Sequence, residues 1–188
     1  MLALATTLVS TAFIFLNMIK LISEPVNKEY KKLIDFAASK CSAFSLVWKY
    51  DLALDESTKT IHELLKSHQV SEEIITSKWV TDKKAIFPIL RKFLINHESI
   101  KELKDIPAKF ACPDRESKAS WRIDSNRKPG LFSWVSPCLP EDLVFYSQQG
   151  EIWLEAVSHE EEFYMYDSES ANELMLKIPS IKNEKSNN

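Results

Sequence analysis

Glycine is nearly missing from this sequence, because the chain of 188 residues has only Gly130 and Gly150. The dinucleotide-binding fingerprint and the P-loop both need several closely spaced glycines, since only glycine lets the backbone approach phosphate groups so closely. Neither motif can be written with glycines at these two positions. The sequence therefore excludes nucleotide binding by either route.

Cysteine is also scarce, and no catalytic or metal-binding spacing accompanies it. Cys41, Cys112 and Cys138 are odd in number and lack C-x-x-C spacing, which favours reduced thiols over a zinc knuckle or a full disulfide framework. Cys112 and Cys138 flank an irregular stretch and would pair only in an oxidising compartment. The chain contains no G-x-S-x-G elbow and no H-E-x-x-H pair. We therefore expect no metal and no cofactor.

The rest of the composition is typical of one soluble globular domain. Apolar residues make up 45% of the chain and charged residues 27%, and this length suffices for a sizeable core. The net charge of -3 hides an asymmetry, because residues 139–188 carry -8 and the preceding residues +5. We expect a single α+β domain over residues 18–181, followed by a polar tail over residues 182–188.

Residues 1–17 form an apolar appendage that allows three interpretations. In the first interpretation Met18 is the true start, and in the second the segment is a buried helix. In the third it is a membrane segment in which residues 1–19 contact the bilayer. A secretory signal would have a basic region before the apolar run, whereas the first charged residue here is Lys20. We expect a cytoplasmic protein, with membrane anchoring through this segment as the alternative.

Helical and strand periodicities alternate along the body of the chain. Helices are expected after caps at Ser23 (with Pro25 in the first turn), Asp55, Asn96 and either Asp167 or Ser168. Alternation from Phe44 to Tyr50 predicts a strand, and a second strand either begins after Pro88 or is an edge strand. Residues 107–140 lack periodicity and predict a long loop, part of which docks on the body through its aromatic residues. The predicted core positions of the first two helices are Val26, Tyr30, Leu33, Ile34, Ala37, Cys41, Ile61, Leu64, Leu65 and His68.

The clearest local plan lies in residues 139–167, which read as a three-stranded antiparallel meander. Its strands are Leu143–Tyr146, Ile152–Val157 and Phe163–Tyr166, rich in aromatic and branched residues. Gly150 is the natural residue for a positive φ in the first turn. The predicted architecture is α+β, with helices packed on one face of an antiparallel or mixed sheet and this meander at its C-terminal end.

A resemblance rests on this meander. Its residues resemble the C-terminal signature of a family of small uncharacterised bacterial proteins, and in composition the chain is similar to immunity proteins of toxin systems. The first resemblance implies a bacterial cytosolic α+β protein, whereas the second is a likeness of fold and composition, which by itself assigns no function. The matching positions are Leu139, Pro140, Glu141, Asp142, Leu143, Gly150, Trp153, Leu154, His159 and Glu160.

Two classes of function remain open from the sequence. The first is a non-enzymatic module that binds a basic protein through an acidic surface, on which nucleic acid is not expected to bind. The second is a small hydrolase or metal-dependent enzyme that uses His159, Glu160 and Glu155, with Arg122 as an anion binder. The binding module is preferred because no specific catalytic spacing is present. Its predicted partner-binding residues are Glu141, Asp142, Glu151, Glu155, Glu160, Glu161 and Glu162.

Overall fold

The computed structural model describes residues 18–49, 56–75, 90–110, 128–135 and 139–184. Within them the chain forms one eight-stranded antiparallel sheet with the strand order β3-β4-β2-β5-β6-β7-β1-β8. The predicted α+β class is confirmed. The strands are β1 (Ile19–Ile22), β2 (Cys41–Lys49), β3 (Gln69–Ile75), β4 (Leu90–Asn96), β5 (Glu141–Ser147), β6 (Ile152–Val157), β7 (Glu162–Met165) and β8 (Lys182–Asn183). The helices are α2 (Lys28–Lys40), α3 (Glu56–Lys66), the 3₁₀ helix η1 (His97–Lys104), α4 (Ile106–Lys109), the 3₁₀ helix η2 (Leu131–Ser133) and α5 (Ser168–Lys177).

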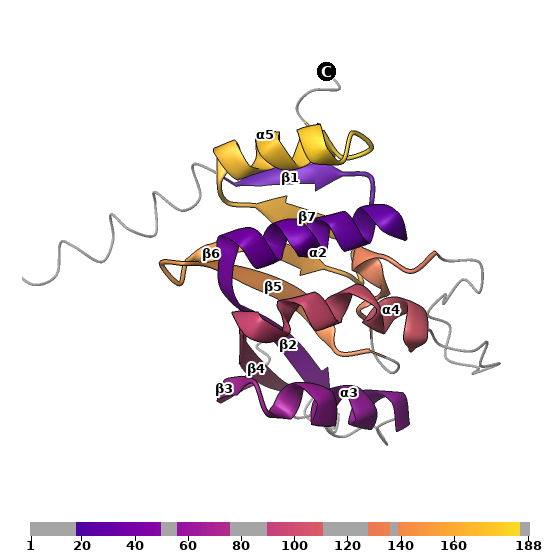
Figure 1. The fold of residues 1–188 in the computed structure, drawn as a ribbon, viewed down its shortest axis with the longest axis vertical. Helices are drawn as coiled ribbons and strands as arrows, with labels where there is room; N and C mark the ends of the chain where they lie inside the picture. Colours follow the sequence, from indigo (N-terminus) through magenta and orange to yellow (C-terminus); the bar gives the residue numbers. More distant parts are fainter. Residues whose placement is uncertain (1–17, 50–55, 76–89, 111–127, 136–138, 185–188) are drawn as a thin grey trace, which may run out of the picture.

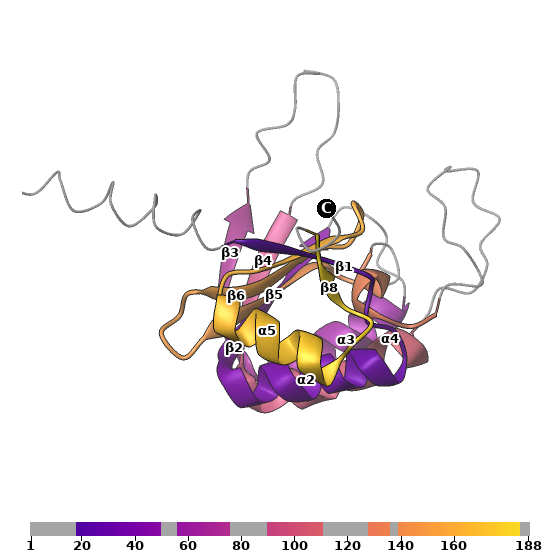
Figure 2. The same cartoon turned by 90° about the horizontal axis from the view of Figure 1, so that it is seen from above.

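The helices α2, α3, α4 and α5 lie on one side of the sheet, as Figure 2 shows from above. Phe44, Leu46 and Trp48 alternate along β2, share one face of the sheet and are buried. Trp48 forms an edge-to-face contact with His62 of α3, and Trp153 of β6 forms one with Phe36 of α2. One continuous core therefore lies between the sheet and the helical layer.

The C-terminal meander is present as predicted. The strands β5, β6 and β7 are neighbours in the sheet, and Leu154 of β6 lies between Phe145 and Met165. Gly150 has a φ of 80° in the first turn. The side chain of Asp167 accepts hydrogen bonds from two backbone amides of α5, which confirms it as the predicted cap.

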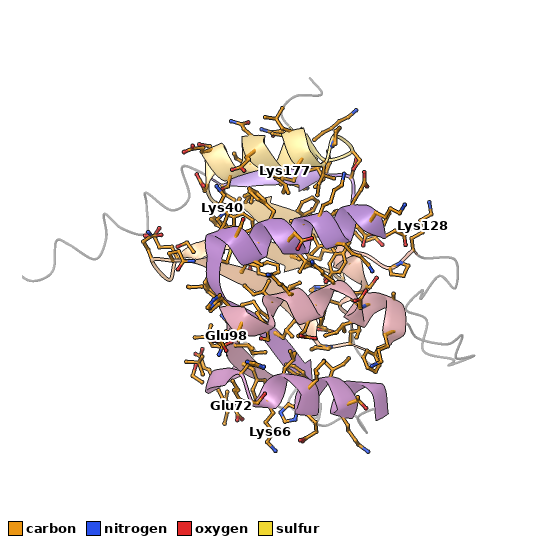
Figure 3. The ribbon with its side chains drawn as sticks, viewed as in Figure 1. Lys40, Lys66, Glu72, Glu98, Lys128 and Lys177 are labelled. Carbon is orange, nitrogen blue, oxygen red and sulfur yellow. The ribbon has the colours of Figure 1, made fainter. Side chains whose placement is uncertain are left out.

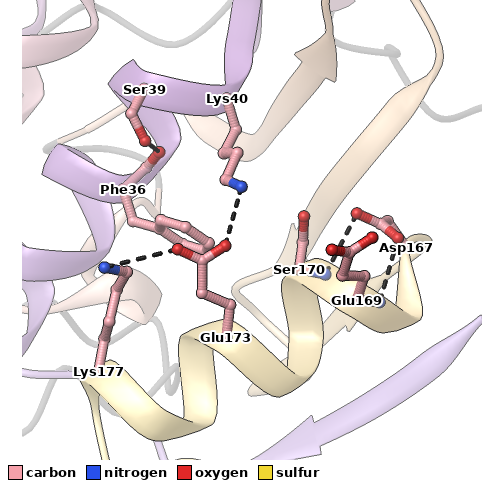
Figure 4. Close-up of polar contacts among 8 residues, drawn as sticks. All are labelled: Phe36, Ser39, Lys40, Asp167, Glu169, Ser170, Glu173 and Lys177. Carbon is pink, nitrogen blue, oxygen red and sulfur yellow. Dashed lines mark hydrogen bonds and ion pairs between the residues drawn. The ribbon is translucent and has the colours of Figure 1, made fainter.

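Helix α5 is joined to α2 by charged side chains around one aromatic ring (Figure 4). The carboxylate of Glu173 lies 2.8 Å from Lys40 Nζ and 3.5 Å from Lys177 Nζ. Each ammonium group also lies over the ring of Phe36, 5.4 and 5.5 Å from its centroid. Phe36 is itself buried, so this arrangement covers the outer edge of the core where the two helices meet.

Several local predictions were wrong at the ends of elements. Helix α2 begins at Lys28 after Asn27, and Ser23 is no cap because its φ of 74° belongs to the bend after β1. Leu64 is exposed on α3, whose buried positions include Ile61 and Leu65. The strand predicted at residues 44–50 begins earlier, at Cys41. Lys182 and Asn183, predicted to start the polar tail, instead pair with β1 as β8.

Part of the predicted long loop does dock on the body, through residues 128–135. The amide of Asn27 donates to the carbonyl of Pro129 at 2.7 Å, and Val26 forms an isolated bridge with Gly130. A Cβ at Gly130 would lie 2.8 Å from the backbone carbonyl oxygen of Pro25, so only glycine allows this approach. Leu131, Phe132 and Trp134 are consequently buried.

The predictions for residues 1–17, Tyr50, Asp55, Cys112, Cys138 and Trp121 fall outside the described residues. The strand predicted near Pro88 is described from Leu90 onward, after the proline, and it lies between β3 and β2 rather than at an edge. No described helix has the length and apolar character needed to cross a bilayer.

Candidate protein-binding surface

The face of the sheet opposite the helices, which we call the helix-free face, carries a row of residues from successive strands. The register places Tyr164 of β7 opposite both Lys20 of β1 and Glu155 of β6. The middle of the row is buried, whereas the end formed by β1, β6 and β7 is partly exposed. The whole row consists of Lys20, Tyr164, Glu155, Val144, Ser45 and Leu94.

Two carboxylates fix the tyrosine rings at the partly exposed end. Tyr166 donates a hydrogen bond of 2.7 Å to Glu155, and Tyr164 donates one to Glu162. Lys20 donates to the other oxygen of Glu162 at 2.8 Å. These bonds hold the rings in single orientations, and a partner that binds there loses little side-chain entropy from them.

The charge distribution at this end is reflected in the pKa values. The hydrogen bond from Lys20, followed by that from Tyr164, lowers the pKa of the Glu162 carboxyl. The same contact, with help from Glu184, raises the pKa of Lys20 to about 12. Burial, with the hydrogen bond to Glu155, raises the pKa of the Tyr166 hydroxyl. At neutral pH the face therefore presents neutral tyrosines and the ionised carboxylate of Glu162.

An acidic turn adjoins this face, which we define as His159, Glu160 and Glu161 of the β6–β7 turn together with Asp142 of β5. His159 Nδ1 lies 3.8 Å from Asp142 Oδ1, and its Nε2 lies 3.6 Å from Glu160 Oε1. Asp142 and Glu161 both have positive φ values, 54° and 57°. The preceding Ser158 is buried and donates a hydrogen bond to the Leu131 carbonyl, so the turn is anchored on the docked loop.

The structure divides the seven predicted partner-binding carboxylates. Glu160 and Glu161 are exposed in the acidic turn, and Asp142 lies beside them. Glu155 and Glu162 lie on the helix-free face, where they position tyrosines. Of the other two, Glu141 is buried with 8% exposure, and Glu151 follows the β5–β6 turn at the opposite end of β6.

The residues predicted for an enzyme do not form a comparable arrangement. His159 is 54% exposed beside Asp142 and Glu160, while Glu155 hydrogen-bonds to Tyr166 instead. Arg122 lies outside the described residues. Within the described ranges no group of three or more His, Cys, Asp or Glu side chains is arranged to hold a metal ion.

A nucleophilic role is not supported for Cys41 either. This thiol is buried, and burial raises its pKa to about 12. A thiol of this kind stays protonated at neutral pH and is a poor nucleophile.

A shallow recess lies elsewhere, between α3 and β4, where His62, Trp48 and Phe93 meet. None of the predicted site residues lines it.

Sequence reasoning missed the residues that distinguish the helix-free face. Tyr164 and Tyr166 alternate with the buried Phe163 and Met165, and this period of two was the available signal. Lys20 was missed because the four residues of β1 are too few to show a strand pattern.

No protein-family model, curated protein or solved structure matches the chain.

Proposed function

We propose that this protein is a non-enzymatic binding module that docks a basic protein onto the helix-free face and the acidic turn. The observation that carries the proposal is the pair of tyrosines, Tyr164 and Tyr166, held by carboxylates on a sheet face that no described helix covers. Tyrosine is enriched at the energetic centres of protein interfaces, because it combines a large apolar ring with a polar tip. Rings that are already oriented suit such a centre.

The charge of the partner follows from the side chains around these rings. Glu160 and Glu161 are exposed in the acidic turn, and residues 139–188 as a whole carry -8. Lys20 at this end of the face is paired with Glu162 and Glu184, and Lys182 of β8 is a second cation nearby. A basic partner would be steered toward this region, whereas nucleic acid would be repelled.

The class of partner is suggested by the similarity to immunity proteins of toxin systems. Proteins of that kind inhibit by covering a surface of a toxin, and a nuclease toxin has a basic surface because it binds nucleic acid. An acidic face with oriented tyrosines suits such a surface in both charge and chemistry. We therefore propose a secreted-toxin nuclease domain as the partner class.

The test is to measure binding of the full chain to purified proteins encoded by neighbouring genes. Two charge reversals, Glu160→Lys with Glu161→Lys, and the truncation Tyr164→Ala should each weaken binding to a basic partner. The matched control is Glu63→Lys with Glu102→Lys, which makes the same charge change on exposed side chains of α3 and η1, within the helical layer. Equal weakening by the control would remove the assignment of the surface.

The enzyme remains the second candidate because His159 lies between two carboxylates. A hydrolytic or metal-dependent activity that disappears in His159→Ala, with unchanged thermal stability, would favour it. The binding proposal instead expects His159→Ala to retain most of the affinity, since a half-exposed histidine at the side of the tyrosines is not the centre of the interface.

A further inference from the structure

The strand β3 ends the sheet on one side and differs from the strand at the other end. It is seven residues long, whereas β8, at the opposite edge, has two. Among the described strands, only β4 pairs with β3. A long edge strand presents backbone donors and acceptors that an extended segment of another chain can pair with. The shortness of β8 protects the other edge from such pairing.

Residues 70–74 of β3 are exposed, including the large apolar side chains of Val70 and Ile74. Val70 is 63% exposed and Ile74 is 61% exposed, whereas most large apolar residues of the sheet are buried. Figure 3 shows Glu72 at this end of the molecule, far from Lys40 and Lys177 on the α2–α5 side. Apolar side chains on a long edge strand are an aggregation hazard unless a partner covers them.

The charges of the strand indicate what kind of segment would pair with it. Gln69–Ile75 contains Glu72 and Glu73 and no basic residue. If two copies of β3 paired antiparallel with full overlap, Glu72 would lie opposite Glu72 of the second copy, and like charges in that position destabilise a pair. A basic strand would instead place a positive charge opposite these carboxylates, which stabilises the pair. Lys92, which lies opposite Glu73 on β4, has its ammonium over the Tyr146 ring at 5.5 Å.

We propose that β3 is a strand-addition site for an extended basic segment of another protein. In such a pairing a Lys or Arg of the segment lies opposite Glu73 on one face of the sheet. An apolar residue lies opposite Ile74 on the other face, because neighbouring residues of a strand point to opposite faces. The backbone ladder supplies affinity, and the alternating pattern supplies selectivity.

This site is separate from the surface of the proposed function. The strands β4, β2 and β5 lie between β3 and β6, so the two surfaces are at different parts of the sheet. A segment bound to β3 would not contact Glu160 or Tyr164. Either proposal can therefore fail while the other stands.

The experiment titrates the full chain with two short blocked peptides, one of alternating Lys and Val and one of alternating Glu and Val, and follows backbone amides by NMR. We expect the Lys peptide to bind roughly tenfold more tightly than the Glu peptide and to shift the amides of β3. Glu73→Lys should reverse this preference, and Ile74→Ser should weaken both peptides. Glu151→Lys, at the β5–β6 turn, is the matched control and should leave the preference unchanged.

Three results would overturn the proposal. The first is that neither peptide binds, and the second is that both bind equally and leave the amides of β3 unshifted. The third is a concentration-dependent dimer, detected by sedimentation, in which the amides of β3 become protected without peptide. That last outcome would assign the edge to a second copy of this chain.

Discussion

The indole N–H of Trp134 donates a hydrogen bond of 3.0 Å to the hydroxyl of Tyr30, and that hydroxyl donates to the carbonyl of Leu103 at 3.0 Å. All three groups are buried, so the Tyr30 side chain of α2 joins the docked segment 128–135 to η1. Burial raises the pKa of the Tyr30 hydroxyl, which is consequently neutral and able to donate across the physiological range. The acidic turn is anchored on the same docked segment through Ser158.

Tyr30→Phe should destabilise the protein by about 2 to 4 kcal/mol, because it leaves a buried N–H and a buried carbonyl without their partner. Urea unfolding followed by fluorescence measures the change. Tyr146→Phe is the control, since its hydroxyl bonds to Ser45 at a partly buried position and should cost less. A loss under roughly 0.5 kcal/mol for Tyr30→Phe would show that the linkage contributes little.

Trp153→Ala should cost about 3 to 5 kcal/mol, because the ring is buried against Phe36 and Phe145 and its removal leaves a cavity. Trp153→Phe keeps much of the aromatic contact, so its free energy of unfolding should lie between those of the wild-type chain and Trp153→Ala. Equilibrium unfolding in urea separates the three proteins. A cost under about 1 kcal/mol for Trp153→Ala would be inconsistent with a buried ring.

Stability should fall as the pH is lowered through the titration range of the surface carboxylates. The pKa values of Asp105, Glu162 and Glu173 are lowered mainly by hydrogen bonds from Lys31, Lys20 and Lys40 respectively. The folded state therefore binds fewer protons than the unfolded state. The stabilisation is complete above the ordinary carboxyl pKa, and it is lost as the pH falls through the lowered pKa values of the folded state.

Unfolding midpoints measured between neutral and acidic pH test this dependence. The combined variant Asp105→Asn, Glu162→Gln and Glu173→Gln should show a shallower decline than the wild-type chain. Glu102→Gln, an exposed carboxyl on η1, serves as the control and should leave the decline unchanged. An identical pH profile for the combined variant would contradict the assignment of these ion pairs.

A chain beginning at Met18 should fold with the same cooperative thermal transition as the full chain, because it retains β1 and every other described element. A chain beginning at Glu24 loses the strand that lies between β7 and β8, and it should melt at a markedly lower temperature. Differential scanning calorimetry compares the three. Loss of a cooperative transition on removing residues 1–17 alone would show that they belong to the core.

The sequence was sufficient for features whose cause is local. The meander, the cap at Asp167 and the turn at Gly150 each depend on residues close together in the chain. The start of α2 was not predictable in the same way, because Asn27 takes its conformation from a hydrogen bond to the distant Pro129 carbonyl. Long-range pairing similarly decides β8, which is too short to form without β1.

The candidate surface was only partly predictable for the same reason. The acidic side chains could be found by counting charges, but their separation into the acidic turn, the helix-free face and the distant Glu151 depends on the strand register. Burial of Glu141 depends on its position opposite Val47 of β2, which is far away in the sequence. Tyr164 and Tyr166 are candidate binding residues because of their hydrogen bonds to Glu162 and Glu155, and these bonds depend on the fold.

The rate of association with a basic partner, measured by stopped-flow fluorescence at low and at high ionic strength, tests the central claim most directly. We predict that Glu160→Lys with Glu161→Lys slows association at low salt, that the difference shrinks as salt rises, and that dissociation changes little. Glu63→Lys with Glu102→Lys should leave the association rate close to that of the wild-type chain. Unchanged association in the first variant, or equal slowing in both, would contradict docking at the acidic turn.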